Sequence, residues 1–521
     1  MSKRITAVPR TEHYPFPTAG IAEDEKGIAY YEGLPESLTA VLRGHAETIP
    51  DAEAVAEAGG ERLTYAQLYD RATRVAGGLR AAGLESGGRV ALRYPAGMTW
   101  VLAFWGTLLA GGIPVAVNTR FTGGEVDYVL RDADVTVDLG PHTPLPDAAP
   151  FAVEAAPDDV AVLFYTSGTT GRPKGVPNTH RGILSVVESI VRCIGLGGGA
   201  DDPVRTLISV PLFHVTGCNA QLVTAAVLGG TSVILPELNL GRVLELIEWE
   251  QINFLVTVPA VFTLLLRYPG LSAADVSSLR WIGFGGAPAP SSLPAGLRAA
   301  FPGVALVQAY GMTELSAVAT VIPDDVITEH PGSVGYPVPT VDLAIEHTEG
   351  QDWGELLVRG PNVTTGYWHD QETTAKAEVD GWFRTGDIVR ADEAGRIYLI
   401  DRAKDIIIRG GENVSSVEVE NALAAAPGVA EAAVIGVPDD VLGEKVGAIV
   451  VPIAPVLNVA ALLDHARAVL ADYKVPQYLV VSDHPLPRTP AGKVRKPELR
   501  ERTVWGAQLW TGTRSRRTEQ N

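Results

Sequence analysis

Residues 165 to 176 bring hydroxyl groups, glycines and two cations together in one short segment, directly after the apolar run 160–164. Glycine lets the backbone turn tightly and bring bare N–H groups close to a ligand, and clustered N–H groups bind phosphate oxygens. The spacing differs from the Gly-x4-Gly-Lys-Ser/Thr of a Walker A loop. We therefore predict a phosphate-binding loop of another kind, and the alternative is a flexible linker that binds no ligand. The predicted loop residues are Thr166, Ser167, Gly168, Thr169, Thr170, Gly171 and Lys174.

This loop resembles the ATP-phosphate loop of the adenylate-forming superfamily, which contains acyl-CoA and aryl-CoA synthetases, peptide-synthetase adenylation domains and beetle luciferases. Other segments similar to the family follow in the family's order and span about residues 36 to 500. They are residues 213–217, 285–288, 308–314, 354–360, 385–387, 401–413 and 487–493. The chain is most similar to an acyl-CoA synthetase, which implies ATP, Mg²⁺ and CoA as cofactors and a small carboxylic acid as substrate.

The resemblance implies roles for the nucleotide-binding residues. A carboxylate and the α-phosphate of ATP repel each other, by about 4 kcal/mol for two unit charges 4 Å apart at an effective dielectric near 20, so cations must converge on them. Glu314 and Thr166 match the Mg²⁺ ligands, Thr313 the donor to the α-phosphate, and Asp387 with Arg402 the ribose site. Taken alone, Asp387 could be a turn residue and Arg402 a surface cation. The adenine site corresponds to Gly285, Gly286, Ala287, Pro288, Tyr310, Gly311 and Met312, although Tyr310 alone could be a core residue.

Two further sets of residues would serve the two half-reactions in turn. Lys493 matches the lysine that bridges the attacking carboxylate and the α-phosphate. Lys404 matches the hinge about which family members rotate their small domain. Arg409, Gly410 and Gly411 would then face the tunnel for the pantetheine arm of CoA. A simple turn is the alternative for the two glycines.

The acid is predicted from the residues near the motif at 213–217. Val215 stands where enzymes for amino acids or dihydroxybenzoates carry Asp or Asn, and His214 matches a gate beside the acyl carboxylate, with a buried core histidine as the alternative. The predicted acyl pocket consists of His214, Phe254, Val258, Phe262, Gly283, Phe284, Leu306, Ala309 and Ser316. It contains no fixed charge, so we expect a hydrophobic acid, whether fatty, aryl or polycyclic. No carrier domain follows residue 505, which favours free CoA. The alternatives are a ligase that loads a carrier protein, an adenylating enzyme that forms no thioester, and a luciferase-like oxygenase.

The length and composition of the chain restrict its domain number, its binding partners and its location. The 521 residues predict two to four compact units, and the net charge of −19 argues against nucleic acid. The two cysteines form no disulfide or zinc pattern. No signal peptide is evident, and the apolar stretch 99–117 is broken by Gly111, Gly112 and Pro114 before the roughly 20 residues of a membrane span. We expect a cytoplasmic enzyme without a transmembrane segment, for which a homodimer is one option.

A repeated pattern predicts the fold class as α/β. A helix at 100–110 leads through two glycines to a strand ending at 117, and 222–228 leads in the same way to a strand ending at 235. The repeat predicts a large N-terminal domain of two doubly wound subdomains. Short strands at 341–358 and 395–399 add a small β-rich subdomain, and alternating helices and strands beyond 401 predict a small mobile α+β C-terminal domain. The expected division is an arm at 1–35, the large adenylation domain at 36–400, the small domain at 401–505 and a tail at 506–521.

Overall fold

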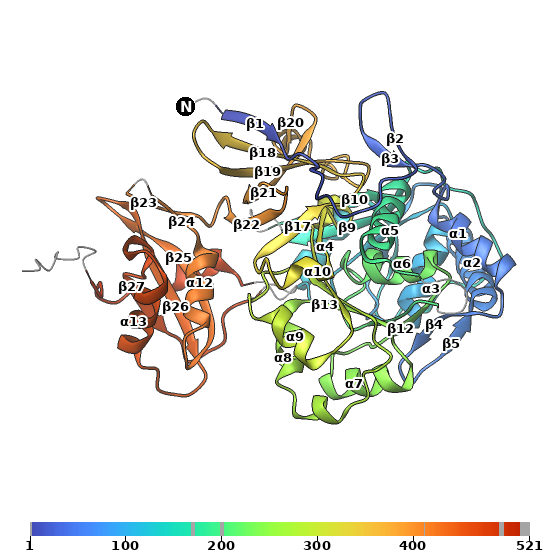
Figure 1. The fold of residues 1–521 in the computed structure, drawn as a ribbon. Helices are drawn as coiled ribbons and strands as arrows, with labels where there is room; N and C mark the ends of the chain where they lie inside the picture. The colour runs from blue at the N-terminus through green and yellow to red at the C-terminus, as the bar shows by residue number, and fades with distance from the viewer. Residues whose placement is uncertain (1–2, 168–171, 198–202, 411, 489–493, 511–521) are drawn as a thin grey trace, which may run out of the picture.

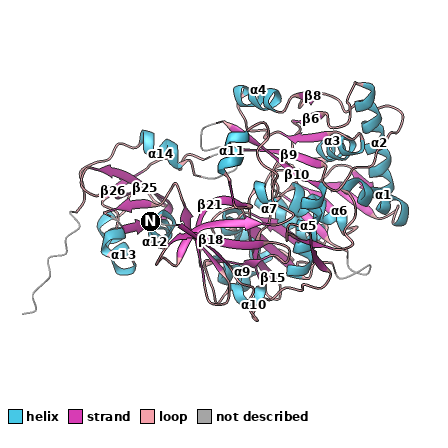
Figure 2. Cartoon of the chain, turned by 90° about the horizontal axis from the view of Figure 1, so that it is seen from above, coloured by secondary structure: helices cyan, strands magenta, loops and turns pink. Residues whose placement is uncertain are grey.

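A large domain of two sheets with covering helices carries a small α+β domain at one end, as Figures 1 and 2 both show. The computed structural model describes residues 3–167, 172–197, 203–410, 412–488 and 494–510. Its architecture confirms the predicted fold class.

The first subdomain is a five-stranded sheet in the order β10-β9-β7-β6-β8, in which β10 alone is antiparallel to its neighbour. Helix α3, the predicted apolar helix, is almost completely buried and ends before the turn at Gly111 and Gly112 that leads into β7. No helix in the described parts of the chain is long and apolar enough to cross a membrane. The strands are β6 (Arg89–Leu92), β7 (Ile113–Ala116), β8 (Val135–Leu139), β9 (Val160–Ser167) and β10 (Pro173–Thr179), and the helices are α2 (Tyr65–Ala81), α3 (Met98–Leu109), α4 (Gly123–Asp132) and α5 (His180–Ile194).

The second subdomain is the parallel part of a 15-stranded sheet, in the order β4-β12-β11-β13-β14-β15, with β5 antiparallel at its edge. The predicted second copy of the helix–glycine–strand unit is present, but its helix begins as a π-helix at Cys218–Val223. The strands are β4 (Glu53–Glu57), β5 (Arg62–Thr64), β11 (Arg205–Ile208), β12 (Thr231–Ile234), β13 (Phe254–Thr257), β14 (Trp281–Gly285) and β15 (Ala305–Tyr310). The helices are α1 (Leu38–Thr48), α6 (Thr224–Val227), α7 (Leu240–Trp249), α8 (Pro259–Leu266), α9 (Leu293–Ala300) and α10 (Asp324–Ile327).

The predicted β-rich part continues the same sheet with antiparallel strands, because β17 pairs with both β16 and β22. Its strands are β16 (Thr320–Ile322), β17 (Ser333–Pro337), β18 (Asp342–Thr348), β19 (Trp353–Arg359), β20 (Glu378–Val379), β21 (Trp382–Ala391) and β22 (Ile397–Arg402), with α11 at Gln371–Lys376.

The N-terminal residues are not the free arm that we expected. Strand β1 (Lys3–Ala7) pairs with β18 along its whole length, and a short hairpin follows from β2 (Ile21–Glu23) and β3 (Ala29–Tyr31). Phe16 is 6% exposed and packs edge-on against Tyr336 of β17. The polar sequence concealed this because β1 is an edge strand with mostly exposed side chains, which needs little apolar patterning.

The small domain has the expected α+β composition: a five-stranded sheet with helices against it, in which β27 pairs parallel with β26 and the other pairs are antiparallel. The strands are β23 (Ile407–Arg409), β24 (Glu412–Val414), β25 (Val429–Asp439), β26 (Gly443–Pro452) and β27 (Tyr478–Val481), and the helices are α12 (Ser416–Ala424), α13 (Val459–Val469) and α14 (Lys496–Arg502). The described part of the predicted tail is also packed, since Leu509 N–H donates to the Gln477 carbonyl at 2.9 Å and Trp510 Nε1 to the Pro476 carbonyl at 2.9 Å.

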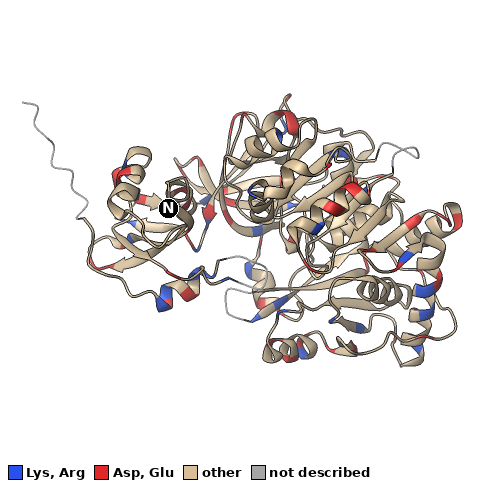
Figure 3. Ribbon diagram, turned by 90° about the horizontal axis from the view of Figure 1, so that it is seen from below, with Lys and Arg blue, Asp and Glu red and all other residues tan. Residues whose placement is uncertain are grey.

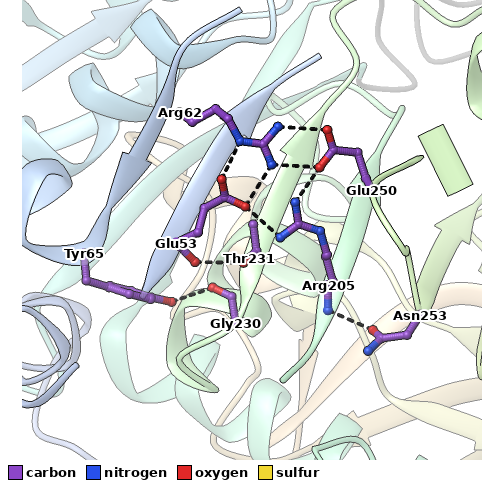
Figure 4. A network of polar contacts seen from close by, with 8 residues as sticks. All are labelled: Glu53, Arg62, Tyr65, Arg205, Gly230, Thr231, Glu250 and Asn253. Carbon is purple, nitrogen blue, oxygen red and sulfur yellow. Dashed lines mark hydrogen bonds and ion pairs between the residues drawn. The ribbon is translucent and has the colours of Figure 1, made fainter. Parts of the chain in front are cut away.

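Two arginines and two glutamates form an ion-pair network at the amino ends of the parallel strands (Figure 4). Arg62 binds Glu53 at 2.5 Å and Glu250 at 2.8 Å, and Arg205 binds the same two carboxylates. The Arg205 backbone N–H also donates to Asn253 Oδ1 at 2.8 Å. The network therefore joins β4, β5, β11 and the segment that follows α7.

We predict that Glu250→Gln lowers the melting temperature near neutral pH. The hydrogen bond from Arg62 lowers the pKa of Glu250 to about 2, and the neutral amide would leave the exposed Arg62 and the half-buried Arg205 with a weaker partner. Hydrogen bonds to charged groups contribute about 1.5–3 kcal/mol each. Because the folded pKa lies below the unfolded one, this stabilisation is complete above about pH 4.5 and disappears as the pH falls toward 2. Thermal denaturation of both proteins from pH 7 to pH 3 measures the difference.

Glu245→Gln provides the matched control, because Glu245 pairs with Arg242 on the same helix in an exposed i,i+3 ion pair. Such a pair contributes at most about 0.5 kcal/mol. A Glu250→Gln protein as stable as the wild type at pH 7 would contradict the prediction.

Candidate active site

The predicted nucleotide and acid motifs meet at the carboxyl ends of the parallel strands. Gly285 ends β14, Tyr310 ends β15, and Val258 follows β13 directly. His214 lies in the segment after β11, half-buried, with its ring 4.7 Å from the Phe213 ring. Crevices at this edge are the usual ligand sites of open α/β sheets.

Two glycines are required here by close backbone approach. A Cβ at Gly285 would lie 2.3 Å from the Ala309 carbonyl oxygen, and one at Gly311 would lie 1.8 Å from the Ala317 carbonyl oxygen. Gly286 has φ +73°, a conformation that other residues rarely adopt. Gly285 at the end of β14 and Gly286, Ala287 and Pro288 after it therefore form a segment free of bulky side chains.

The loop after Gly311 has an unusual backbone. Thr313–Leu315 form one turn of 3₁₀ helix, and then Ser316 and Ala317 have φ of 55° and 135°. The Ser316 hydroxyl donates to the Asn362 carbonyl at 2.9 Å, so this side chain is bonded to the loop after β19.

Three buried asparagines hold this loop. Asn178 Nδ2 donates to the Thr313 carbonyl at 3.0 Å, and Asn219 Nδ2 donates to the Ser316 carbonyl at 2.9 Å and to Asn178 Oδ1 at 3.1 Å. Asn362 Nδ2 donates to the carbonyls of Leu315 and Val318 at 3.0 and 2.9 Å. The sequence analysis did not identify these three residues, which lie far from the loop in the sequence.

Glu314 is 6% exposed and receives a hydrogen bond from the Tyr367 hydroxyl at 3.0 Å. The Lys174 ammonium lies 5.1 Å from the centroid of the Tyr367 ring. Burial, and then the Glu314 carboxylate, raise the pKa of Tyr367, so its hydroxyl keeps its proton and donates. Tyr367 thus connects the predicted metal ligand with the predicted phosphate lysine, and no sequence signal that we used had singled it out.

The backbone holds the same group together. Trp368 N–H donates to the Gly175 carbonyl at 2.9 Å, and the Thr364 hydroxyl donates to the Pro177 carbonyl at 2.9 Å. Thr166 pairs with Lys174 across β9 and β10. The segment 364–368 therefore fixes the strand that leads out of the predicted phosphate loop.

The Glu314 environment fits a magnesium ion. The described residues contain no cluster of three or more His, Cys, Asp or Glu side chains that could hold a metal on their own. Mg²⁺ in phosphate-binding enzymes is commonly held by one or two carboxylates together with phosphate oxygens and waters. A single buried carboxylate, joined through Tyr367 to the predicted phosphate lysine Lys174, is compatible with that requirement.

Asp387, Tyr310 and Arg402 lie together. The Tyr310 hydroxyl donates to Asp387 Oδ2 at 2.6 Å, and Arg402 Nε lies 3.0 Å from Asp387 Oδ1. Asp387 is 2% exposed, and its backbone pairs with Arg402 across β21 and β22. Burial, and then Asp387, raise the pKa of Tyr310 far above its usual range, so this ring is anchored through a protonated hydroxyl.

The predicted acyl pocket is wrong as one set of residues. Phe254, Gly283 and Ala309 lie on the sheet face toward α5, where Trp281 Nε1 donates to the Ile194 carbonyl at 3.1 Å. Phe262, Phe284 and Leu306 belong to the core on the opposite face, beneath α7, α8 and α9. Successive side chains of a strand point to opposite faces, so neighbours such as Gly283 and Phe284 cannot line one pocket.

The small-domain residues are partly described. Gly410 has φ +61° in the hairpin between β23 and β24, which fits the turn named above as the alternative role for this glycine. Arg409 Nε donates to Gln477 Oε1 at 3.0 Å. Lys404 is exposed at the junction of the two domains. Lys493, Gly411 and the loop residues Gly168, Thr169, Thr170 and Gly171 lie outside the described residues.

Comparison with known proteins identifies the class and then the family. The arrangement is that of adenylate-forming enzymes with a large and a small domain. The family model described as AMP-binding enzyme matches residues 42–152 and 138–368, and that of the AMP-binding enzyme C-terminal domain matches residues 418–493. The chain belongs to the AMP-binding enzyme family, which confirms the resemblance seen in the sequence.

Its relatives include CoA ligases. A feruloyl-CoA synthase of Amycolatopsis sp is 37% identical over 482 residues, which cover 87% of this chain and 96% of the relative. The long-chain-fatty-acid–CoA ligase FadD13 of Mycobacterium tuberculosis is 32% identical over 497 residues, with coverages of 88% and 97%. These relatives, together with the family match, confirm the predicted class, an AMP-forming acyl-CoA ligase that uses ATP and CoA.

A solved structure has the same fold. The o-succinylbenzoate CoA synthetase (MenE) of Bacillus subtilis in complex with its acyl-adenylate intermediate OSB-AMP matches with a TM-score of 0.81 and 30% identity, covering 90% of this chain and 98% of that chain. The same enzyme in complex with ATP and a magnesium ion matches with a TM-score of 0.80 and 30% identity, covering 88% and 98%.

We predict that Tyr367→Phe lowers kcat/KM for ATP roughly 10-fold to 100-fold, since a hydrogen bond to a charged group contributes about 1.5–3 kcal/mol. The ring that faces Lys174 is kept, and only the hydrogen bond to Glu314 is lost. Initial rates of pyrophosphate release at several ATP and Mg²⁺ concentrations measure the effect.

Tyr398→Phe is the control, because the Tyr398 hydroxyl reaches Asp392 at 3.2 Å in the hairpin between β21 and β22. We expect its kinetics to match the wild type. If Tyr367→Phe also retained wild-type kcat/KM at every Mg²⁺ concentration, Tyr367 would not position Glu314.

Proposed function

We propose that this ligase activates an uncharged hydrophobic carboxylic acid, fatty or aryl, and transfers it to CoA. The proposal rests mainly on the convergence of Lys174, Glu314, Asp387 and Arg402 around one edge of the sheet, beside a sheet face formed by Phe254, Val256, Gly283 and Ala309. That face offers apolar side chains and a glycine to the acid. Relatives that are named for ferulate and for long-chain fatty acids support this class of substrate.

In the first half-reaction a carboxylate oxygen attacks the α-phosphorus, and the bond to the β-phosphate oxygen breaks to release pyrophosphate. Lys174 and the loop residues Ser167, Gly168, Thr169, Thr170 and Gly171 would bind the phosphates, and Thr313 would donate to the α-phosphate. Asp387 and Arg402 would orient the ribose, and Tyr310 the adenine. Glu314 and Thr166 would hold Mg²⁺, which supplies positive charge to the phosphates.

Lys493 would add positive charge as the carboxylate attacks, and the small domain would then turn about Lys404 for the second half-reaction. The CoA thiol, on losing its proton, attacks the acyl carbonyl, and AMP leaves. Arg409, Gly410 and Gly411 would line the approach of the pantetheine arm, with Gly410 also shaping the hairpin. His214 would lie beside the acyl carboxylate.

The remaining assignments concern partners and location. We propose free CoA as the acceptor, because the relatives above are CoA ligases, and a cytoplasmic enzyme, because ATP and CoA are available there. A homodimer and a carrier-protein acceptor are further possibilities that size-exclusion chromatography and a carrier assay would test. Acidic and basic residues are both scattered over the ribbon in Figure 3, and the net charge of −19 disfavours nucleic acid as a partner.

The proposed function is tested with a panel of fatty, aryl and polycyclic acids. Pyrophosphate release measures adenylation, and thioester formation with and without CoA measures transfer. Activity confined to charged or amino acids would contradict the substrate class, and adenylation without thioester formation would favour an enzyme that has lost the second step.

We predict that Ala309→Leu shifts preference toward smaller acids. Ala309 lies on the apolar face beside Gly285, and a larger side chain there would fill space that we assign to the acyl group. One or two lost methylene contacts correspond to roughly 10-fold to 200-fold in relative kcat/KM. Relative rates across a series of acids of increasing length measure the shift.

Leu306→Met is the matched control on the same strand. Leu306 faces the opposite core, where a swap of similar volume costs less than about 1.5 kcal/mol of stability. Its acid preference should equal that of the wild type, and equal preference in Ala309→Leu as well would move the pocket away from this face.

We predict that Lys493→Ala slows pyrophosphate release roughly 100-fold to 1,000-fold, as expected when one positioned donor to a developing charge is removed. Conversion of preformed acyl-adenylate and CoA to thioester should largely persist. Gly411→Leu should do the reverse. Equal damage to both half-reactions by both substitutions would rule out the rotating small domain.

A further inference from the structure

The border between the two domains lies at Lys404, as the backbone and ion-pair contacts on either side of it indicate. The backbones of Asp387 and Ile388 in β21 pair with those of Arg402 and Asp401 in β22, and Ala403 N–H donates to the Gly386 carbonyl at 2.9 Å. These residues therefore belong to the large sheet. Asp405 instead pairs with Arg500 of α14 at 2.8 Å and belongs to the small domain. Lys404 stands between the two sets.

A hydrogen-bonded contact crosses this border. Asp401 Oδ2 accepts from the Ser416 backbone N–H at 2.5 Å and from the Ser416 hydroxyl at 2.6 Å, where α12 begins. The Ser415 hydroxyl donates to the Ile400 carbonyl at 2.6 Å. Asp401 is 1% exposed and Ser416 is fully buried, so water does not screen these bonds in this arrangement.

On the small-domain side, Ser416 is also bonded to Lys496, which lies close in the sequence to Lys493. Lys496 Nζ donates to the Ser416 hydroxyl at 2.5 Å and pairs with Glu420 at 2.8 Å. Lys496 opens α14, three residues after Lys493. A negative carboxylate at the start of α12 is also favoured by the helix dipole. One buried carboxylate of the large domain thus binds α12 directly and the base of α14 through Ser416.

We propose that Asp401, together with Ser415 and Ser416, is a latch that holds the small domain in the arrangement described here. The inference rests on the proposed function, because a turn about Lys404 would move Ser415 and Ser416 with the small domain and leave Asp401 with the sheet. The latch must open each time the small domain rotates, so its strength sets the population of this arrangement and the balance between the two half-reactions. Asp401 is a positioning residue and touches no substrate.

The test measures the domain arrangement directly. Leu238→Cys in the large domain and Val456→Cys in the small domain replace exposed residues, and both native cysteines, Cys193 and Cys218, are buried, so spin labels attach at the new sites. Pulsed EPR distances in Asp401→Asn should show the population of this arrangement reduced roughly tenfold relative to the others, as expected for weakened hydrogen bonds to a charged group. The ratio of pyrophosphate release to thioester formation from preformed adenylate should change with it.

Two further variants make the outcome decisive. Ser416→Ala removes the hydroxyl, with its bond to Asp401 and the bond that it accepts from Lys496, and keeps the backbone bond to Asp401. It should therefore shift the distances in the same direction by less, and it is the variant to measure if Asp401→Asn does not fold. Asp392→Asn is the matched control, since Asp392 accepts comparable bonds from Ala394, Arg396 and Tyr398 wholly within the large domain. It should leave the distances unchanged.

Distances in Asp401→Asn and Ser416→Ala that equal those of the wild type, in proteins with wild-type melting temperature, would overturn the latch. A wild-type protein that forms neither adenylate nor thioester would instead refute the proposed function, and the EPR distances would still report on the latch.

Discussion

The candidate site depends on three buried amide side chains that hold a loop in an unfavourable backbone conformation. Thr313 and Glu314 are followed by two non-glycine residues at positive φ, a state that costs of order 1–3 kcal/mol per residue unless surrounding contacts enforce it. Asn178, Asn219 and Asn362 supply those contacts from the end of β10, from the π-helix and from the loop after β19. The loop therefore reaches its shape only when all three parts of the large domain have assembled.

The residues proposed to bind the ribose and the domain border lie next to each other along the strands β21 and β22. Asp387 binds Tyr310 on one side and Arg402 on the other, and the next residue back from Arg402 is Asp401. A ligand that reorganises the Asp387 bonds would act on residues adjacent to the latch. If nucleotide binds there as proposed, it would have a short physical route to the orientation of the small domain, through direct contacts.

Local patterns were sufficient to predict much of this molecule. The two helix–glycine–strand units, the β-rich extension and the helices of the small domain follow from periodicity and glycine position. Motif resemblance had paired Asp387 with Arg402, which do form an ion pair, whereas their roles toward a ligand stay predictions. The asparagines and Tyr367 had no such signal, because each acts on residues tens of positions away. Strand β1 lacked apolar patterning. The predicted set of acyl-pocket residues was wrong because it placed adjacent residues of β14 on one face of the sheet. In each case the missing information was a tertiary contact or a strand register.

The ion-pair network and the site motifs occupy opposite ends of the same parallel strands. Glu53 and Arg205 stand where β4 and β11 begin, and Glu250 lies in the segment between α7 and β13, whereas Gly285 and Tyr310 stand where β14 and β15 end. Substitutions that are far apart and share no partner usually have additive effects. Changes that adapt this sheet to a new acid and changes that adapt it to a higher working temperature can therefore accumulate on separate residues, so the two properties are free to evolve independently.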